Sequence, residues 1–451
     1  MRIFTKSFME WWEMENFFEK LSDKIWSWPL LLLFIFVGAF LTFRLRAVQI
    51  FGIGRAFRSI SSKRNGSAVS SYSALCTALA ATIGTGNIVG VATAIGTGGP
   101  GALFWMLLAA FLGMGTQFVE GFLAVRYGGG PYIYMEKGLR SKNFARIYAF
   151  ITSMAGILGV GTITQMNSIS VAVDQLFPGK PVCMGCSVWV LIFTGGVFIL
   201  SSAVILGGSG RIAKVCSYLV PLMSGIFLFC SVFLVLRNLE CLPYAVRLIM
   251  KGAFQPQAIM GAGAGIGVKE VLRMGVGRGV FTNEAGMGTA AIAAASSGET
   301  CPYTQGLISM SATFIDTLII CTLSGLSLIV TDVWNAPLMG GELTTYAWEI
   351  GLPWNGNLSE ILLNLCLIFF AFATILGWGF YAEQCFCYLS KGRGLKLYRV
   401  LYLSALLVAP FFSVNGVFYL ADILNGLMAM PNLVAVLLLH EEAVKEVRKK
   451  D

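Results

Sequence analysis

Residues 82–90 read TIGTGNIVG and place two threonines, an asparagine and three glycines inside an otherwise apolar run. Glycine loosens a helix because it loses the most backbone freedom on folding. A local break frees main-chain N–H and C=O groups, which a bilayer tolerates only where protein or a cavity surrounds them. The freed N–H groups suit a carboxylate, and the freed carbonyls with the threonine hydroxyls suit a hard monovalent cation such as sodium. This stretch therefore predicts a binding site for an amino acid and a cation.

A second interruption of the same kind occurs at residues 275–295, which read GVGRGVFTNEAGMGTAAIAAA. The two interrupted spans lie five spans apart, so the spans from the second onward divide into two sets of five. Paired interrupted helices in halves of opposite orientation indicate a transporter with inverted repeats. A glycine-rich packing face explains one such stretch equally well, but two in register favour binding.

The composition is that of a polytopic helical membrane protein. Of 451 residues, 56% are hydrophobic and 12% are charged, too few charges to cover a soluble surface. Many apolar runs reach the roughly 20 residues that cross a bilayer, and they are continuous rather than short and alternating, which excludes a β-barrel. Lys and Arg collect in the cytoplasmic loops of membrane proteins, so the net charge of +9 does not indicate nucleic-acid binding.

We expect eleven spans, at about 29–48, 70–97, 100–126, 144–174, 185–206, 212–236, 265–297, 304–330, 359–389, 396–414 and 416–439. They group into an amphipathic N-terminal segment at the membrane interface (1–28), an extra first helix with a basic cytoplasmic loop (29–69), a first five-helix repeat (70–236), an extracellular loop (237–264), a second repeat (265–440) and a basic cytoplasmic tail (441–451). Basic residues between spans one and two, between spans three and four, and in the tail place these segments in the cytoplasm. The basic residues of 237–278 are the exception, and the rule is weak for longer segments.

Acidic side chains inside apolar spans are functional candidates, because a charge within a bilayer is costly. The four examples are Glu120, Glu284, Asp316 and Glu383. Glu284 lies in the second interruption and would cap its free N–H groups or pair with Arg278. Asp316 would tune a cation site or pair internally. A proton-coupled carrier would need one of these acids to titrate.

An intramembrane enzyme would need a nucleophile–base pair or a metal constellation, and neither is visible in a chain whose single histidine is His440. Cys183 and Cys186 form one CxxC pair, which without a second pair at zinc spacing is either a structural or redox pair or apolar packing. A passive channel or an amino-acid receptor is the remaining alternative of a different class.

At the interrupted spans the chain resembles the alanine or glycine:cation symporter family, which consists of sodium-coupled carriers of small amino acids. GTGNIVGVATAI and RGVFTNEAGMGTAAIAAA are similar to the motifs of the family's two broken core helices, and TQMNSIS, TFIDTLIICTLSG and FAFATILGWGFYAEQ are further family-like pieces. The resemblance covers about residues 30–440. It implies a core of five-plus-five inverted repeats, as in the neurotransmitter:sodium symporters, preceded by one extra helix.

The resemblance also implies two groups of binding residues and a pair that supports the breaks. The substrate group is Thr85, Gly86, Asn87, Gln165, Phe281 and Trp378; the first four hold the charged ends of the amino acid, and the two rings close over a small side chain. The sodium group is the carbonyls of Ala80, Ile83 and Ala371 with the hydroxyl of Thr374, and the supporting pair is Glu284 and Asp316. Judged without the resemblance, Phe281 and Trp378 are more simply packing aromatics, whereas a buried amide such as Asn87 is costly unless it is paired.

The activity that the resemblance implies is sodium-coupled uptake of alanine, glycine or both across a bacterial plasma or inner membrane by alternating access. Sodium would be a co-substrate, and no cofactor or nucleic-acid partner is expected. Proton coupling through Glu284 or Asp316 is the alternative within transport. The choice among glycine, L-alanine and D-alanine stays open, as does the number of cations, because a second cation would use Asn87 and Thr317.

Overall fold

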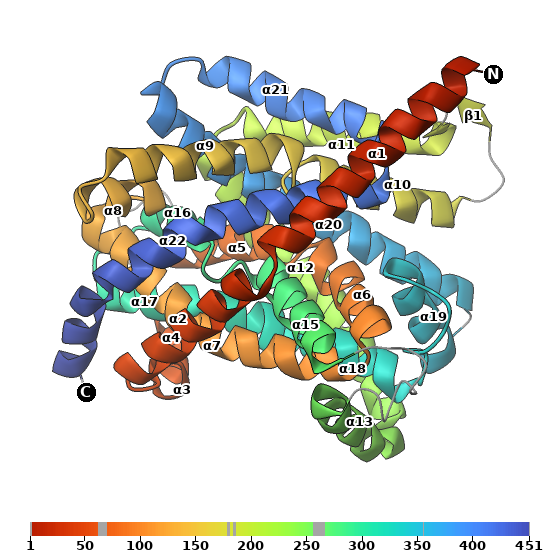
Figure 1. The fold of residues 1–451 in the computed structure, drawn as a ribbon, viewed down its shortest axis with the longest axis horizontal. Coiled ribbons are helices and arrows are strands. Elements are labelled where there is room, and N and C mark those ends of the chain that lie inside the picture. The colour runs from red at the N-terminus through yellow and green to blue at the C-terminus, as the bar shows by residue number, and fades with distance from the viewer. Residues whose placement is uncertain are drawn as a thin grey trace.

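The computed structural model describes residues 2–61, 70–177, 181–183, 186–255, 267–354 and 356–450, and within these ranges the chain is almost entirely helical (Figure 1). The helices are α1 (Arg2–Ile25), α2 (Trp28–Arg44), α3 (Val48–Phe51), α4 (Ile53–Ser61), α5 (Ser71–Thr82), α6 (Val89–Gly98), α7 (Gly101–Tyr127), α8 (Pro131–Lys137), α9 (Lys142–Leu158), α10 (Ile163–Leu176), α11 (Val188–Ile205), α12 (Ser209–Arg237), α13 (Leu242–Phe254), α15 (Val268–Asn283), α16 (Thr289–Ser296), α17 (Pro302–Thr313), α18 (Thr322–Val330), α19 (Gly341–Gly351), α20 (Gly356–Ser390), α21 (Leu395–Val408) and α22 (Val414–Lys450).

Short irregular elements connect several of these helices. They are the 3-10 helices η1 (Thr85–Asn87), η2 (Leu239–Cys241) and η5 (Ala409–Phe411), the π-helical segment η4 (Phe314–Cys321), and the strands β1 (Val182–Cys183) and β2 (Cys186–Ser187). The two strands pair antiparallel and place Cys183 opposite Cys186. The glycine-rich part of the expected outer loop (261–266) lies outside the described residues, as do Lys63 and Arg64 of the first basic loop.

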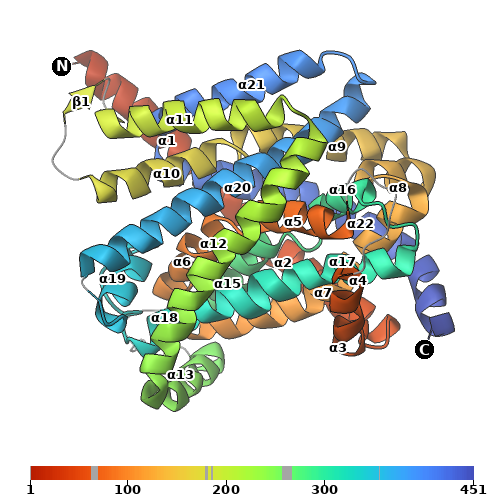
Figure 2. The same ribbon diagram turned by 180° about the vertical axis from the view of Figure 1, so that it is seen from behind.

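Three of the basic segments lie at the same end of the molecule. In Figures 1 and 2, α3, α4, α8 and the C-terminal end of α22 lie at one end, and β1, α19 and the N-terminal end of α1 lie at the opposite end. The basic segments between spans one and two and between spans three and four therefore share an end with the basic tail. This is the separation that the positive-inside rule requires; that this end faces the cytoplasm stays a prediction.

Among the described residues, eight helices are long and apolar enough to cross a membrane, or nine if α5 and the η1–α6 stretch form one bent span. The multi-pass helical class is thereby confirmed. The expected spans 265–297 and 396–414 are not among these helices. α15 and α16 are short and separated by a break, and α21 has only 14 residues. The count of eleven stays a prediction.

Both expected interruptions are present, and two further irregularities were not predicted. The first broken pair bends by 60° between α5 and the η1–α6 stretch, and α15 and α16 are separated by Glu284–Gly288. The expected span 144–174 divides into α9 and α10 around Gly159–Thr162, and the expected span 304–330 contains the π-helical η4.

The expected outer loop contains a helix. Pro243 lies in the first turn of α13, where the missing N–H of proline costs nothing, so it starts a helix within the segment 237–264. The segment 332–358 likewise contains α19. At the N-terminus α1 packs against α22, and the indole N–H of Trp26, just after α1, donates to the main-chain oxygen of Asp422 over 2.9 Å.

Two long helices position the broken ones. α20 packs against α5, α9, α10 and α12, while α7 packs against α2, α15, α16 and α17. α16 contacts both α5 and α20, so the halves of the two broken helices meet between these scaffolds.

Candidate functional site

The first break is stabilised from within its own loop. α5 ends at Thr82, Gly84 has an extended backbone (φ −131°, ψ −158°) and α6 begins at Val89. The side-chain oxygen Oδ1 of Asn87 accepts a hydrogen bond from the Gly84 N–H over 2.9 Å. Asn87 thus pairs one of the donors that the break frees, and its side chain is fully buried.

Two glycines of this break are needed for close approach. A Cβ at Gly84 would lie 2.6 Å from the hydroxyl oxygen of Thr374, and a Cβ at Gly86 would lie 2.6 Å from Cγ2 of Thr282. α20 and α15 therefore approach the broken backbone more closely than any other residue type would allow.

Two of the predicted cation residues, Ala80 and Thr374, meet near the end of α5. The Thr374 hydroxyl donates to the main-chain oxygen of Ala80 over 3.1 Å and also lies 3.1 Å from the carbonyl of Phe370 in its own helix. Ile83 is the C-cap residue of α5, and Ala371 lies about one turn before Thr374 in α20. Carbonyl and hydroxyl oxygens of this kind are the donor set that a hard cation prefers.

One of the predicted substrate residues at the first break, Thr85, contacts α10. The Thr85 hydroxyl donates to Oε1 of Gln165 over 3.3 Å, and the Gln165 amide donates to the carbonyl of Val160 over 3.1 Å. Both side chains are almost completely buried. The gap between α9 and α10 thus supplies an acceptor that fixes the orientation of Gln165.

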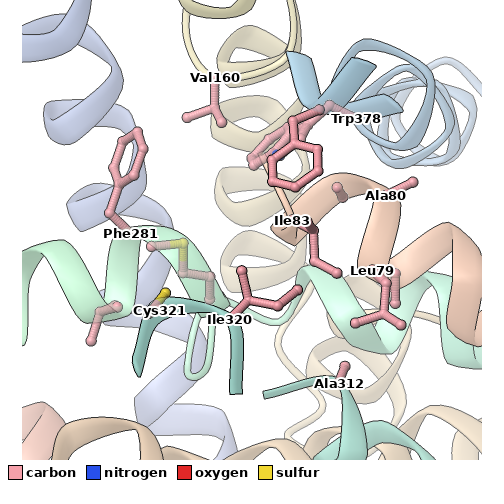
Figure 3. Close-up of a cluster of buried hydrophobic side chains, with 14 of the residues drawn as sticks. Leu79, Ala80, Ile83, Val160, Phe281, Ala312, Ile320, Cys321 and Trp378 are labelled. Carbon is pink, nitrogen blue, oxygen red and sulfur yellow. The ribbon is translucent and has the colours of Figure 1, made fainter. Parts of the chain in front are cut away.

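The two predicted aromatic residues reach the same region from different helices. Figure 3 shows Phe281 and Trp378 on either side of Val160, with Ile83 next to Trp378. Phe281 approaches Gly86, where an added Cβ would lie 3.5 Å from its ring atom Cδ1. The indole N–H of Trp378 donates to Oε1 of Glu284 over 2.8 Å, so Trp378 is anchored by a polar contact as well as by packing.

The second break uses left-handed backbone. Glu284, Gly286 and Gly288 have φ values of 56°, 91° and 82°. Such values favour glycine, and a side chain at Gly288 would in addition meet Pro131 at 2.5 Å. The hydroxyl of Thr289 donates to Oε2 of Glu284 over 2.5 Å, which connects the two sides of the break.

The expected roles of Glu284 are only partly present. Its carboxylate accepts from side chains on α16 and α20 rather than from the main-chain N–H groups that it was expected to cap. Arg278 pairs instead with Asp422 on α22, with Nη2 and Oδ2 3.2 Å apart. The carboxylate that accepts a main-chain N–H of the break is Glu120 on α7, over 3.2 Å from Gly288.

Asn432 was not predicted as a site residue, yet it holds the second break. Its amide donates to Oε1 of Glu120 over 2.6 Å and to the carbonyl of Gly286 over 2.9 Å, and its oxygen accepts from the Tyr134 hydroxyl. A buried asparagine directly after Pro431 in an apolar span was the available signal in the sequence.

Asp316 contacts the first break directly and is linked to the second through Thr317. Its Oδ1 accepts from the Asn87 amide over 2.7 Å, and its Oδ2 accepts from the Thr317 hydroxyl over 2.7 Å. The amide of Asn283, the last residue of α15, donates to the Thr317 oxygen over 3.2 Å. The expectation that Asp316 supports the breaks therefore has a geometric basis; Thr317 and Asn283 complete the contact.

A cavity of about 690 Å³, which we call the vestibule, lies beside these residues. Its lining comes from α1, α6, α10, α15, α19, α20, α22 and the segment before α19, and it includes the charged side chains of Asp23, Arg273 and Arg278. Of the predicted substrate residues, Phe281 is the one that lines it. Phe281 thus lies between the vestibule and the first break.

The chain matches a known family over almost its whole length. The model of the sodium:alanine symporter family matches residues 11–450. The chain belongs to this family. It is accordingly a multi-pass membrane transporter and not an enzyme.

Individual relatives of this family member match over nearly their whole length. An uncharacterized transporter of Haemophilus influenzae is 42% identical, with 96% of each chain covered. The sodium/alanine symporter AgcS of Methanococcus maripaludis is 38% identical, with 94% of each chain covered. Among solved structures, MhsT in complex with L-phenylalanine superposes with a TM-score of 0.59 at 13% identity and covers 81% of this chain and 87% of its own. That likeness concerns the fold.

Proposed function

We propose that this transporter couples the uptake of a small neutral amino acid, alanine or glycine, to sodium. The observation that carries the proposal is the cluster at the end of α5, where the Thr374 hydroxyl lies 3.1 Å from the Ala80 carbonyl and directly beside Gly84. Sodium there would bind oxygen atoms of both α5 and α20. The relative named as a sodium/alanine symporter supports the same choice of ion and substrate.

The amino acid would bind next to this cation, at the first break. The main chain at Thr85 and Gly86, with the side chains of Asn87 and Gln165, would hold its charged ends. Phe281 and Trp378 would leave room for a small side chain, because extra methylene groups must be overpacked or excluded. Each ligand then favours the binding of the other by the same coupling free energy.

Uptake into proteoliposomes tests the proposal. Full-length protein is assayed with radiolabelled glycine, L-alanine, D-alanine and L-glutamine, with and without an inward sodium gradient. We expect uphill, sodium-driven uptake of glycine or alanine that Asn87→Ala abolishes. Thr374→Ala should raise the sodium concentration for half-maximal uptake about tenfold or more, since one charge-assisted contact contributes about 1.5–3 kcal/mol.

The controls separate sodium coupling from its alternatives. Thr374→Ser retains the hydroxyl and should retain the sodium dependence. Uptake driven by a pH gradient and indifferent to sodium would replace the proposal by proton coupling through Glu284 or Asp316. Flux that never exceeds equilibrium would indicate a channel, and uptake of L-glutamine alone would contradict the small substrate.

A further inference from the structure

One chain of buried hydrogen bonds joins the two broken helices through a third helix. It begins at Gly84, whose N–H donates to Asn87, and the Asn87 amide donates to Asp316. It continues from Asp316 through the Thr317 hydroxyl to the amide of Asn283. The side chains of Asn87, Asp316, Thr317 and Asn283 are all at most 1% exposed.

The far end of this chain lies in the second break. The side-chain oxygen Oδ1 of Asn283 accepts the N–H of Ala285 over 3.0 Å, and the Asn283 carbonyl accepts from the Gln117 amide over 2.9 Å. Ala285 lies between Glu284 and Gly286, which both have left-handed backbone. The hydrogen-bond chain therefore runs from the main chain of one break to the main chain of the other.

We propose that Asp316 is the positioning residue that ties the two broken helices together and transmits the effect of a bound cation from one to the other. The inference rests on the proposed function, since it assigns the coupling between the two ligands to a specific side chain. Asp316 suits this role because a carboxylate has two acceptor oxygens, and here each accepts one donor, from Asn87 and from Thr317.

The local structure around Asp316 is unusual in a way that fits this role. Asp316 and Thr317 lie in η4, where the helix is wound as a π-helix. Such segments are rare and occur frequently at functional sites. The same segment ends at Cys321, whose sulfur lies 3.3 Å from the Asn87 amide nitrogen, so η4 contacts the first break at two points.

The hydrogen-bond geometry favours positioning over ion binding at Asp316. Each oxygen of the carboxylate already accepts a donor from the protein, the Asn87 amide on one and the Thr317 hydroxyl on the other, both over 2.7 Å. The cation position at Ala80 and Thr374 lies on the other side of Gly84, where an added Cβ would touch the Thr374 oxygen at 2.6 Å. A cation there fixes Gly84, and Asn87 passes this constraint to Asp316.

The coupling is measured with purified full-length protein and radiolabelled L-alanine. The ratio of L-alanine affinities at high and low sodium gives the coupling factor for each variant. Asp316→Asn keeps the shape but leaves only one acceptor oxygen, and Thr317→Val removes the hydroxyl that reaches Asn283. We expect each to reduce the coupling factor about fivefold or more, and the double variant to reduce it no further than the stronger single one, because both interrupt the same chain.

The matched control is Thr322→Val, because the Thr322 hydroxyl contacts carbonyls of its own helix within the described part of the chain, at 2.9 Å from Leu318 and 3.3 Å from Thr317. Its coupling factor should equal that of the wild type. Coupling factors that stay unchanged in both test variants, or effects that add in the double variant, would overturn the proposal. If Asp316→Asn fails to fold, Thr317→Val decides the question alone.

Amide hydrogen exchange separates failure of the inference from failure of the proposed function. In Asp316→Asn we expect faster exchange in peptides of both breaks, around 84–88 and 284–288, and no change in Thr322→Val. Faster exchange in one break only would refute the link. A wild type that binds no L-alanine in a sodium-dependent way would remove the proposed function and the transmission of the cation effect, while the exchange experiment would still decide whether Asp316 ties the breaks together.

Discussion

Gly84 has almost no free space around its α-carbon, and this is the feature on which the candidate cation position depends. Gly84→Ala would place a methyl carbon 2.6 Å from the Thr374 hydroxyl oxygen. We expect the sodium concentration for half-maximal uptake to rise about tenfold, because overpacking costs about 1–3 kcal/mol. Gly90→Ala is the matched control, since its nearest neighbour would be 4.0 Å away. Equal effects of the two substitutions would show that the space at Gly84 is unimportant.

At the scale of single residues, several members of the candidate site could be predicted from the sequence, but most of their hydrogen-bond and ion-pair partners could not. Ala80 and Thr374 were expected together and do meet, although 294 positions separate them. The pairing of Arg278 with Asp422 instead of Glu284 depends on which distant side chain the fold brings to Arg278. Such a choice is made by tertiary packing, which the local sequence does not contain.

Side chains from the surrounding helices stabilise the second break by hydrogen bonds. Asn432→Ala on α22 would leave the Gly286 carbonyl and the Tyr134 hydroxyl without this partner. We expect the free energy of unfolding to fall by about 2–4 kcal/mol, because several buried polar groups lose a hydrogen bond at once. Thermal unfolding of the full-length protein measures the loss.

Asn425→Ala provides the comparison for this experiment. Asn425 lies on the same helix and is almost equally buried, but neither of its amide atoms has a hydrogen-bond partner among the described residues. Its replacement should therefore have a much smaller effect. A similar loss of stability in both variants would mean that burial alone, and not the contact with the break, makes Asn432 important.

At the scale of helices, the breaks that contain glycine clusters could be predicted from the sequence. The irregular segments without such clusters could not. Glycine clusters identified both broken helices. The π-helical winding of η4 has no equivalent signature, because it depends on a shift in main-chain pairing that residues such as Ile315 and Leu318 do not favour over an α-helix. α13 was missed because proline ends some segments and begins others.

The whole molecule has one end where the vestibule lies and one where the basic segments gather. Val171 and Met339 line the vestibule and are 41% and 55% exposed. In a variant whose exposed native cysteines are replaced, Val171→Cys and Met339→Cys should react with a membrane-impermeant thiol reagent added to intact cells. Lys445→Cys on the C-terminal tail should react only after the cells are permeabilised, because positive segments stay in the cytoplasm. Labelling of Lys445→Cys in intact cells would reverse the predicted orientation.

The position of Asn432 near the end of the chain also has a consequence for biosynthesis. During synthesis, Glu120 and Gly286 emerge from the ribosome long before Asn432, which follows them by 312 and 146 positions. Until α22 has entered the membrane, the left-handed turns of the second break lack the amide that pairs with them, so the ligand site stays unfinished. Nascent chains that stop before α22 would expose unpaired polar groups in the bilayer, which makes them recognisable to the proteases that remove incomplete membrane proteins.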